Sequence, residues 1–264
     1  VRILFQPAEE VAMGAKYMIE HGALDGVDAI YGAHIWGGFE APYLNFESGP
    51  RMASADNFTI EVEGVSAHGS APHQGVDAIL AAAHIITEVQ AIVSRMNDPL
   101  NPLVVTFGTI NGGQRFNIIP NKVVMTGTVR TLSSEMRKKT EEILRSIVEH
   151  VTAIHGATGS LEMKYLTSVV SNDHEDLNQI AEKAAVKLYG EGCLKHLEKM
   201  MGSEDFSFFM DEVPGIYGFL GSYDPEKGYT ASNHNDCYTA DEGLLKRGAA
   251  MYAQFAWDLS LIHI

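Results

Sequence analysis

The expected order of strands and helices changes twice along this chain, and that change limits the folds it can adopt. Residues 1–54 and 168–258 alternate short apolar strands with helices, which is the pattern of an α/β domain. Residues 55–167 follow the order strand, helix, strand, strand, helix, strand, as in the split βαβ, ferredoxin-like unit. We therefore predict one α/β domain that is interrupted by an inserted ferredoxin-like domain.

In the first part of the α/β domain, the sequence predicts a strand, a helix and a second strand. Residues 2–5 are a short apolar run that Pro7 ends, and apolar residues at helical spacing follow over residues 11–21. Residues 28–33 form the second expected strand. Short parallel strands of this kind place ligand sites at their carboxyl ends.

The other expected elements follow the same two patterns. In the inserted segment we predict strands at residues 57–63, 103–110, 122–130 and 160–166, with helices at 75–93 and 133–154. The second part of the α/β domain carries a helix at about 177–188, a strand at 215–220 and a helix at 241–257. Residues 259–264 continue no pattern, so we interpret them as a non-native tail.

Charge and cysteine content exclude several classes of protein. With 19 Lys and Arg against 34 Asp and Glu, the net charge is −15, and we expect no nucleic-acid partner, because such binding needs a basic face. An anionic membrane is disfavoured for the same reason. No apolar run reaches the ~18 residues of a membrane span, and from the opening residues we expect no signal peptide. The two cysteines, Cys193 and Cys237, favour reduced thiols in a cytoplasmic protein.

Metal-type side chains occur where the expected strands of the α/β domain end. Glu9 and Glu10 follow the first strand, His34 ends the second, and His234 lies in the polar loop after the strand at 215–220. If these strands are neighbours in one parallel sheet, Glu10, His34 and His234 meet at one edge. Carboxylate and imidazole ligands suit Zn²⁺ or Mn²⁺.

Glu9, Glu10 and His34 also have simpler interpretations. Adjacent side chains on an extended segment point to opposite sides, so one of Glu9 and Glu10 can bind a cation while the other faces a substrate. Both could instead favour a helix N-terminus through the helix dipole. A histidine at a strand end, such as His34, is often a hydrogen-bonded structural residue.

Polar residues of the inserted segment could contact a ligand. His68 lies among small residues in SAHGSAPH, and His73 in the same motif is interpreted as a loop or cap residue. Asn117 in RFNIIPN and Arg130 at a strand end could bind a carboxylate, although a surface ion pair is the alternative for Arg130. No function is predicted for the histidines on or beside helices, which are His84, His150 and His155.

Six motifs, taken together and in order, resemble the M20 amidohydrolases. They are FQPAEE, GAHIWG, SAHGSAPH, RFNIIPN with GTVRT, MGSEDFSFF and the NHND loop. The resemblance runs from Val1 to about Trp257 and is greatest to the branch of N-acyl-amino-acid deacylases, hippurate hydrolases and auxin-conjugate hydrolases. It implies a metal-binding catalytic domain with an inserted lid that commonly dimerises.

The resemblance also implies a role for the residues of the α/β domain. Glu9 looks like the general base, and Glu10, His34 and His234 look like ligands of two divalent metal ions. Mn²⁺ and Zn²⁺ are the expected ions, with Co²⁺ and Ni²⁺ as further options. Residues 202–206 resemble a stretch that lines the pocket, without a separate role for either acidic residue in it.

For the inserted segment, the resemblance implies contacts with the substrate. His68 resembles the lid histidine that stabilises the oxyanion, often in the site of the partner subunit. Asn117 and Arg130 resemble the pair that holds the free carboxylate or neighbouring polar groups of the substrate. The expected assembly is a homodimer formed through the lid, with a small N-acyl amino acid as substrate.

The expected reaction is metal-dependent hydrolysis of the amide bond of an N-acyl amino acid, which releases a carboxylic acid and a free amino acid. Members of the family carry a Cys-Gly-His-Asp segment upstream of FQPAEE, and its Cys and His complete the two-metal site. Because this chain begins after that position, we expect it to be N-terminally incomplete. Two alternatives stay open: a di- or tripeptidase of the same superfamily, and a non-catalytic fragment for dimerisation or ligand binding.

Overall fold

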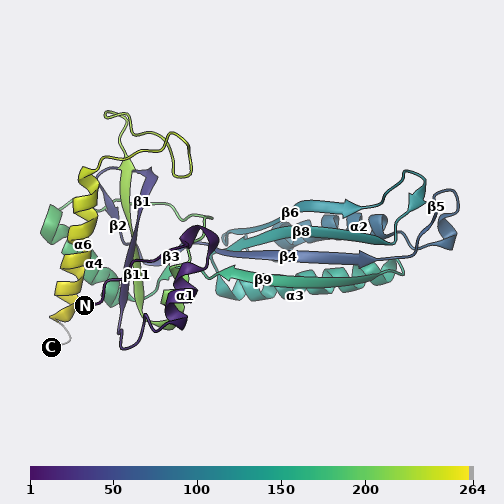
Figure 1. Ribbon diagram of the computed structural model, residues 1–264, viewed down its shortest axis with the longest axis horizontal. Coiled ribbons are helices and arrows are strands. Elements are labelled where there is room, and N and C mark those ends of the chain that lie inside the picture. The colour runs from purple at the N-terminus through teal and green to yellow at the C-terminus, as the bar shows by residue number, and fades with distance from the viewer. Residues whose placement is uncertain (262–264) are drawn as a thin grey trace. The chain divides into compact units, whose positions relative to one another are not determined.

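The computed structural model describes residues 1–261 and consists of two compact units, and Figure 1 labels most of their long helices and strands. Unit 1 comprises Val1–Met52, Val170–Met200 and the chain from Glu204 onward, and unit 2 comprises Ala53–Val169 with Met201–Ser203. The predicted boundaries were 54/55 and 167/168. The expected tail at 259–264 begins inside the last helix, and residues 262–264 lie outside the described residues.

The main sheet of unit 1 has the strand order β1, β11, β2. Its strands are β1 (Ile30–Glu40), β11 (Gly215–Tyr223) and β2 (Leu44–Asn45). β1 and β11 are parallel, as the α/β pattern predicts, and β2 pairs with β11 in the antiparallel sense. A second, two-stranded antiparallel sheet joins β3 (Gly49–Met52) to β10 (Val170–Asn172).

The helices of unit 1 pack on both faces of its main sheet, because alternate side chains of β11 enter two different cores. Ile216 and Leu220 pack with α4 and α6, whereas Tyr217 and Phe219 pack with α1 and α5. A strand that is buried on both faces is typical of the centre of an α/β layer structure. The helices are α1 (Gly14–Glu20), α4 (Glu175–Tyr189), α5 (Ser207–Glu212) and α6 (Gly243–Ser260).

The strand predicted at residues 2–5 is wrong. These residues form no regular element, and the side chains of Ile3 and Phe5 are 74% and 88% exposed. A strand needs a neighbour that completes its hydrogen-bond ladder. β1 lies at an edge of the sheet, and no strand within residues 1–261 pairs with its outer side.

Two further expectations for this region need correction. The helix predicted from Val11 begins at Gly14, and Glu9–Val11 forms a separate 3₁₀ turn, η1. The strand predicted at 28–33 continues to Glu40, because β11 supplies hydrogen-bond partners along its length. His34 therefore lies inside a strand, opposite Phe219, and not at the end of one.

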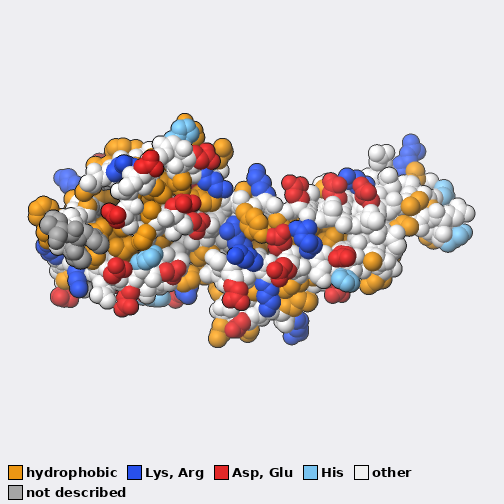
Figure 2. All heavy atoms as spheres, turned by 90° about the horizontal axis from the view of Figure 1, so that it is seen from below, with side chains coloured by type: hydrophobic (Ala, Val, Ile, Leu, Met, Phe, Trp, Pro, Cys, Tyr) orange, Lys and Arg blue, Asp and Glu red, His pale blue; other side chains and the backbone are white. Residues whose placement is uncertain are grey.

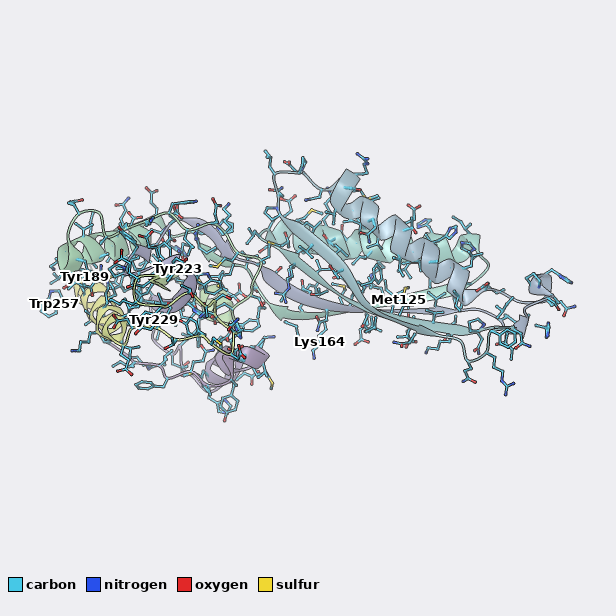
Figure 3. All side chains as sticks on the ribbon, turned by 90° about the horizontal axis from the view of Figure 1, so that it is seen from above. Met125, Lys164, Tyr189, Tyr223, Tyr229 and Trp257 are labelled. Carbon is cyan, nitrogen blue, oxygen red and sulfur yellow. The ribbon has the colours of Figure 1, made fainter. Side chains whose placement is uncertain are left out.

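Unit 2 contains a four-stranded antiparallel sheet with the order β6, β8, β4, β9. Along the chain its long elements follow the order strand, helix, strand, strand, helix, strand. Phe58, Ile60 and Val62 alternate along β4 into a core with both helices, and Met125 of β8, labelled in Figure 3, is fully buried in the same core. The long elements are β4 (Ser54–Glu63), α2 (Ala78–Ala91), β6 (Leu103–Gly112), β8 (Lys122–Thr131), α3 (Ser134–Ile154) and β9 (Thr158–Thr167).

Short elements complete unit 2. They are β5 (Ala67–His68), η2 (Pro72–Gln74), the π-helical turn η3 (Ile92–Met96) and β7 (Ile118–Ile119).

On the face that Figure 2 shows, acidic and basic side chains are interspersed. The two cysteines form no disulfide, since Cys193 and Cys237 are both free, as predicted.

One helix of unit 2 corrects an expectation about membranes. By length and composition, Ala78–Met96 is long and apolar enough to cross a bilayer, which the sequence was not expected to contain. Its apolar side chains include Ala81, Ile85 and Val89, which are fully buried in the core of unit 2. Over the apolar span as a whole, 28% is buried, so the core of unit 2 covers only a part of it.

A buried ion pair joins α3 to β4. The carboxylate of Asp56 is fully buried and accepts hydrogen bonds from the Nε (2.8 Å) and Nη2 of Arg137. The guanidinium of Arg137 also lies over the ring of Tyr165, 4.6 Å from its centroid. Removing one partner of such a pair leaves an unpaired buried charge, which costs far more than the pair itself contributes.

We predict that Arg137→Met lowers the free energy of unfolding of unit 2 by about 3–5 kcal/mol, measured by urea denaturation, because Asp56 would keep a buried charge without its partner. Arg145→Met is the matched control. Arg145 lies on the same helix and pairs with Glu141, but its side chain is 54% exposed, so the loss should stay below about 1 kcal/mol. Equal losses in the two variants would contradict this account.

Candidate functional site

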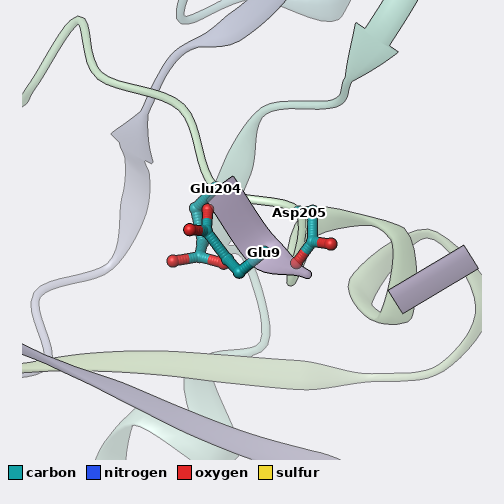
Figure 4. A group of neighbouring side chains, drawn as sticks. All are labelled: Glu9, Glu204 and Asp205. Carbon is teal, nitrogen blue, oxygen red and sulfur yellow. The ribbon is translucent and has the colours of Figure 1, made fainter. Parts of the chain in front are cut away.

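Three carboxylates converge in unit 1, as Figure 4 shows. Glu9 comes from η1, and Glu204 and Asp205 come from the segment that precedes α5. One oxygen from each group lies within 4.8 Å of the other two. Glu204 and Asp205 are 5% and 0% exposed, so the negative charges share a largely buried volume. Such an arrangement is stabilised by a cation or by a proton.

Hydrogen bonds from three parts of unit 1 hold the two buried carboxylates. Oε2 of Glu204 accepts from the hydroxyl of Tyr217 on β11 at 2.7 Å. Oδ2 of Asp205 accepts from the backbone N–H of Ala15 on α1 at 3.1 Å, and its Oδ1 accepts from Nε2 of Gln6. The central strand, the first helix and the N-terminal segment therefore all meet at this pair of residues.

The electrostatics of the cluster act most visibly on Glu9. Burial, and then the negative charges of Glu204, Asp205 and Glu10, raise the pKa of Glu9 to about 7. Burial also raises the pKa of Glu204 and of Asp205. A carboxyl group that titrates near neutral pH can both accept and return a proton, as a general base or acid must.

The structure places the three predicted metal ligands in unit 1 but does not bring them into one cluster. Oε2 of Glu10 lies 3.9 Å from Nδ1 of His234. His34 lies close enough to Glu204 to oppose the rise in the pKa of that carboxyl group. Among the described residues, however, the group of three with metal-ligand spacing consists of Glu9, Glu204 and Asp205. It contains none of the three predicted ligands. The ligand assignment of Glu10, His34 and His234 stays a prediction.

The side chain of Asn233 fixes the loop that carries His234 against β1. Its Oδ1 accepts from the N–H of Gly37 at 2.7 Å, and its Nδ2 donates to the carbonyl of Ile35 at 3.2 Å. His234 itself has a φ of 63°, a conformation that residues other than glycine adopt at a cost. Nδ1 of His34 donates to the carbonyl of Ile35 at 2.6 Å, which leaves its Nε2 with a free lone pair for an ion.

In unit 2, two of the predicted substrate-binding motifs meet. β5 pairs with β7 so that His68 stands opposite Ile118, and the N–H of Gly69 donates to the carbonyl of Asn117 at 2.8 Å. The ring of His68 is exposed, with Nδ1 2.7 Å from Oγ of Ser70. His68 and Asn117 therefore belong to one end of unit 2.

Arg130 belongs to the other end of unit 2. Lys122 and Arg130 are eight positions apart on β8, which corresponds to roughly 26 Å, since a strand rises about 3.3 Å per residue. Asn117 precedes Lys122, in the connection that pairs with β5 beyond that end of β8 in Figure 1. Within one chain, Asn117 and Arg130 are therefore too far apart to hold the same carboxylate, and their assignment as substrate-binding residues stays a prediction. Nη1 of Arg130 donates to the carbonyl of Met201 and to Oγ of Ser203, at 3.4 and 3.3 Å.

Glu204 and Asp205 are the residues that sequence reasoning missed. The stretch at 202–206 was expected to line the pocket, but neither carboxylate received a role. A signal was present, since two adjacent acidic residues stand directly before the aromatic residues Phe206, Phe208 and Phe209. Acidic side chains in an apolar stretch are seldom buried without a partner, so burial here indicates a specific role.

Comparisons with known proteins agree with the six motifs. The sequence profile described as "Peptidase family M20/M25/M40" matches residues 1–258. Thermostable carboxypeptidase 2 of Saccharolobus solfataricus is 37% identical over 266 residues, which cover 98% of this chain and 66% of that protein. N-acetylcysteine deacetylase of Bacillus subtilis is 35% identical over 257 residues, which cover 97% of this chain and 65% of that protein. This chain thus spans about two thirds of the length of both relatives.

A solved structure gives the same result. The YXEP protein of Bacillus subtilis, described as a dinuclear metal binding peptidase from the M20 family, superposes with a TM-score of 0.82. It is 31% identical in sequence, and the match covers 98% of this chain and 65% of that chain. The mixed α/β fold described above is therefore the fold of a solved M20 protein.

The carboxylate cluster predicts a pH-dependent stability of the metal-free protein. The folded-state pKa of Glu9 is raised from 4.5 to about 7, so its contribution to stability is complete below the unfolded value and is lost as pH rises through about 7. Between about pH 5 and pH 8, with a chelator present, Glu9→Gln should therefore lose less in melting temperature than the unaltered protein.

Glu20→Gln, an exposed position on α1, is the control for this experiment and should follow the unaltered protein. Parallel pH profiles for Glu9→Gln and the unaltered protein would show that the cluster does not strain the fold.

Proposed function

This chain belongs to peptidase family M20/M25/M40, and from that premise we propose that the protein hydrolyses the amide bond of N-acyl amino acids with divalent metal ions. The observation that carries the proposal is the position of Glu9, a carboxyl group with a pKa of about 7 beside two buried carboxylates. The similarity to N-acetylcysteine deacetylase supports an N-acyl amino acid as substrate. The products are a carboxylic acid and a free amino acid.

The donors of unit 1 fit divalent metal ions. Carboxylate and imidazole groups suit Zn²⁺ and Mn²⁺, and a cation relieves the repulsion within the carboxylate cluster. We propose two ions, as in the dinuclear YXEP protein, with Glu10, His34 and His234 among their ligands. When bound, such ions make a water-derived nucleophile available near neutral pH and polarise the acyl carbonyl.

Glu9 would carry the proton in this reaction. Its carboxylate takes a proton from the attacking water and later returns it to the nitrogen of the departing amine. In the metal-free protein the pKa of Glu9 is about 7, so its acid and base forms are both available at neutral pH. The hydrogen bond from Tyr217 holds Glu204 in place, and the charge of Glu204 adds to the effect of burial, which raises the pKa of Glu9.

We propose that unit 2 is a ferredoxin-like lid that also forms a homodimer. His68 would donate to the oxyanion, and Asn117 and Arg130 would bind the substrate's carboxylate or neighbouring polar groups. Because Asn117 and Arg130 of one chain lie at opposite ends of β8, one substrate meets both only if two chains contribute. A homodimer therefore accounts for both assignments.

A second candidate function is peptide hydrolysis, and the similarity to a thermostable carboxypeptidase favours it. The two reactions break the same kind of bond and differ in the group that must fit beside it. For either reaction we place the protein in the cytoplasm, in keeping with its free thiols.

A substrate panel separates these functions. We predict that the full-length protein, loaded with Mn²⁺ or Zn²⁺, hydrolyses N-acetyl amino acids and hippurate with a higher kcat/KM than dipeptides and tripeptides. The reverse order would assign it to the peptidases. If the metal-loaded protein hydrolysed none of them, the proposal would be replaced by a non-catalytic role.

Substitutions in the full-length protein test the assigned roles. Glu9→Gln should abolish turnover and leave the metal content unchanged, because only the proton carrier is lost. His68→Ala should lower kcat by ~10²–10³, the usual effect of losing one oxyanion donor, whereas His73→Ala in η2 should have no effect. Turnover within about threefold for His68→Ala would remove that residue from the mechanism. Loss of metal in Glu9→Gln would instead reverse the roles of Glu9 and Glu10.

A further inference from the structure

Three histidines that the proposed hydrolase does not use gather in unit 2. They lie in a groove of about 300 Å³ between α2 and α3, on helix surfaces that face away from the sheet. The groove is lined by His84, Glu88, Ser146, Ile147, His150, Val151, Ile154 and His155. Its polar lining thus combines three imidazoles with one carboxylate, which are metal-ligand types.

Two of the imidazoles already have the separation of a shared metal site. The rings of His84 and His155 are 4.8 Å apart between centroids and lie at 83° to each other. Two imidazoles that bind one tetrahedral ion through nitrogens at 2.0–2.1 Å have centroids about 5 Å apart. The observed separation of the rings is therefore close to that of two ligands on one ion.

His155 carries an unsatisfied polar atom at this place. Its Nε2 is buried and has no hydrogen-bond partner among the described residues. Buried side-chain nitrogens are normally paired, so this nitrogen is available to a water, a ligand or an ion in the groove. Edge-to-face packing with His84 does not satisfy this atom as a hydrogen bond would.

The remaining donors come from the same two helices. Nδ1 of His150 donates to the carbonyl of Ser146 at 2.7 Å, so its Nε2 keeps a lone pair. Metal-binding histidines typically have this arrangement, with the second ring nitrogen bonded to a carbonyl. Glu88 lies four residues after His84, on the same face of α2.

We propose that this groove binds one transition-metal ion, with His84 and His155 as its central ligands and Glu88 and His150 completing the set. The set rich in imidazole favours Zn²⁺, Cu²⁺ or Ni²⁺ over Mg²⁺ or Ca²⁺. In the described conformation, three of these donors do not stand within 4.8 Å of one another. Glu88 and His150 are exposed, so rotation of their side chains closes the site and links α2 to α3.

The test uses Zn²⁺ alone and the unaltered full-length protein first. The side-chain nitrogens of the histidines are followed by NMR during a titration with Zn²⁺. The buffer contains no Mn²⁺, because this paramagnetic ion would broaden the signals. We expect Nε2 of His155 and a nitrogen of His84 to shift together. Signals of both rings that stay unchanged up to millimolar Zn²⁺ would overturn the proposal.

Equilibrium dialysis then gives the number of bound ions. The double variant His84→Asn/His155→Asn should bind one Zn²⁺ fewer per chain than the unaltered protein, whereas His73→Asn, an exposed histidine of the same unit, should bind the same number. An unchanged number in the double variant contradicts the proposal. If circular dichroism shows that the double variant is unfolded, the NMR titration of the unaltered protein decides.

Ions bound in unit 1 can be distinguished from the ion in the groove. Glu10→Gln should lower the number of ions bound in unit 1 and leave the shifts of His84 and His155 intact. Conversely, loss of the groove ion should leave amide hydrolysis unchanged. Failure of the groove site and failure of the proposed hydrolase therefore give different outcomes.

Discussion

Like charges held together in a buried volume are the constraint on which the site of unit 1 depends. Glu9, Glu204 and Asp205 would separate into solvent if nothing opposed their repulsion. The hydroxyl of Tyr217 and the backbone N–H of Ala15 oppose it by holding the two buried carboxylates. These contacts compensate the charges in part, and burial together with the remaining repulsion raises the pKa of Glu9. The fold thus maintains a place where a proton or a cation is bound more strongly than in water.

The central strand of unit 1 keeps the carboxylate cluster in place. β11 is buried on both faces, so its side chains are fixed by two cores at once. Tyr217 points into the core that contains Phe206, and its hydroxyl reaches Glu204 from there. The neighbouring strand β1 carries His34, and the side chain of Asn233 ties the loop of His234 to that strand. The strands that stabilise unit 1 by packing, β1 and β11, therefore also position the polar side chains of the site.

How far the sequence predicts this structure depends on whether a feature is local. Hydrophobic periodicity predicts the six long elements of unit 2 in their observed order, because each has a period of its own. The strand expected at residues 2–5 fails, because a strand needs a partner that periodicity does not reveal. Glu204 and Asp205 are near in sequence to no other site residue, and only tertiary packing brings Glu9 to them. For the same reason, motif order did not show that Asn117 and Arg130 lie at opposite ends of β8.

The two donor sets of this chain differ in chemistry, and that difference has a consequence for metal selectivity. In unit 1 the cluster around Glu9 consists of carboxylates, which are hard oxygen donors that suit Mn²⁺, and the proposed ligands Glu10, His34 and His234 add one carboxylate and two imidazoles. In unit 2 the groove offers His84, His150 and His155, whose nitrogens prefer Zn²⁺, Cu²⁺ or Ni²⁺. A single metal supply would then fill the two places differently. Because one set lies within each compact unit, occupation of the groove need not alter the chemistry at Glu9.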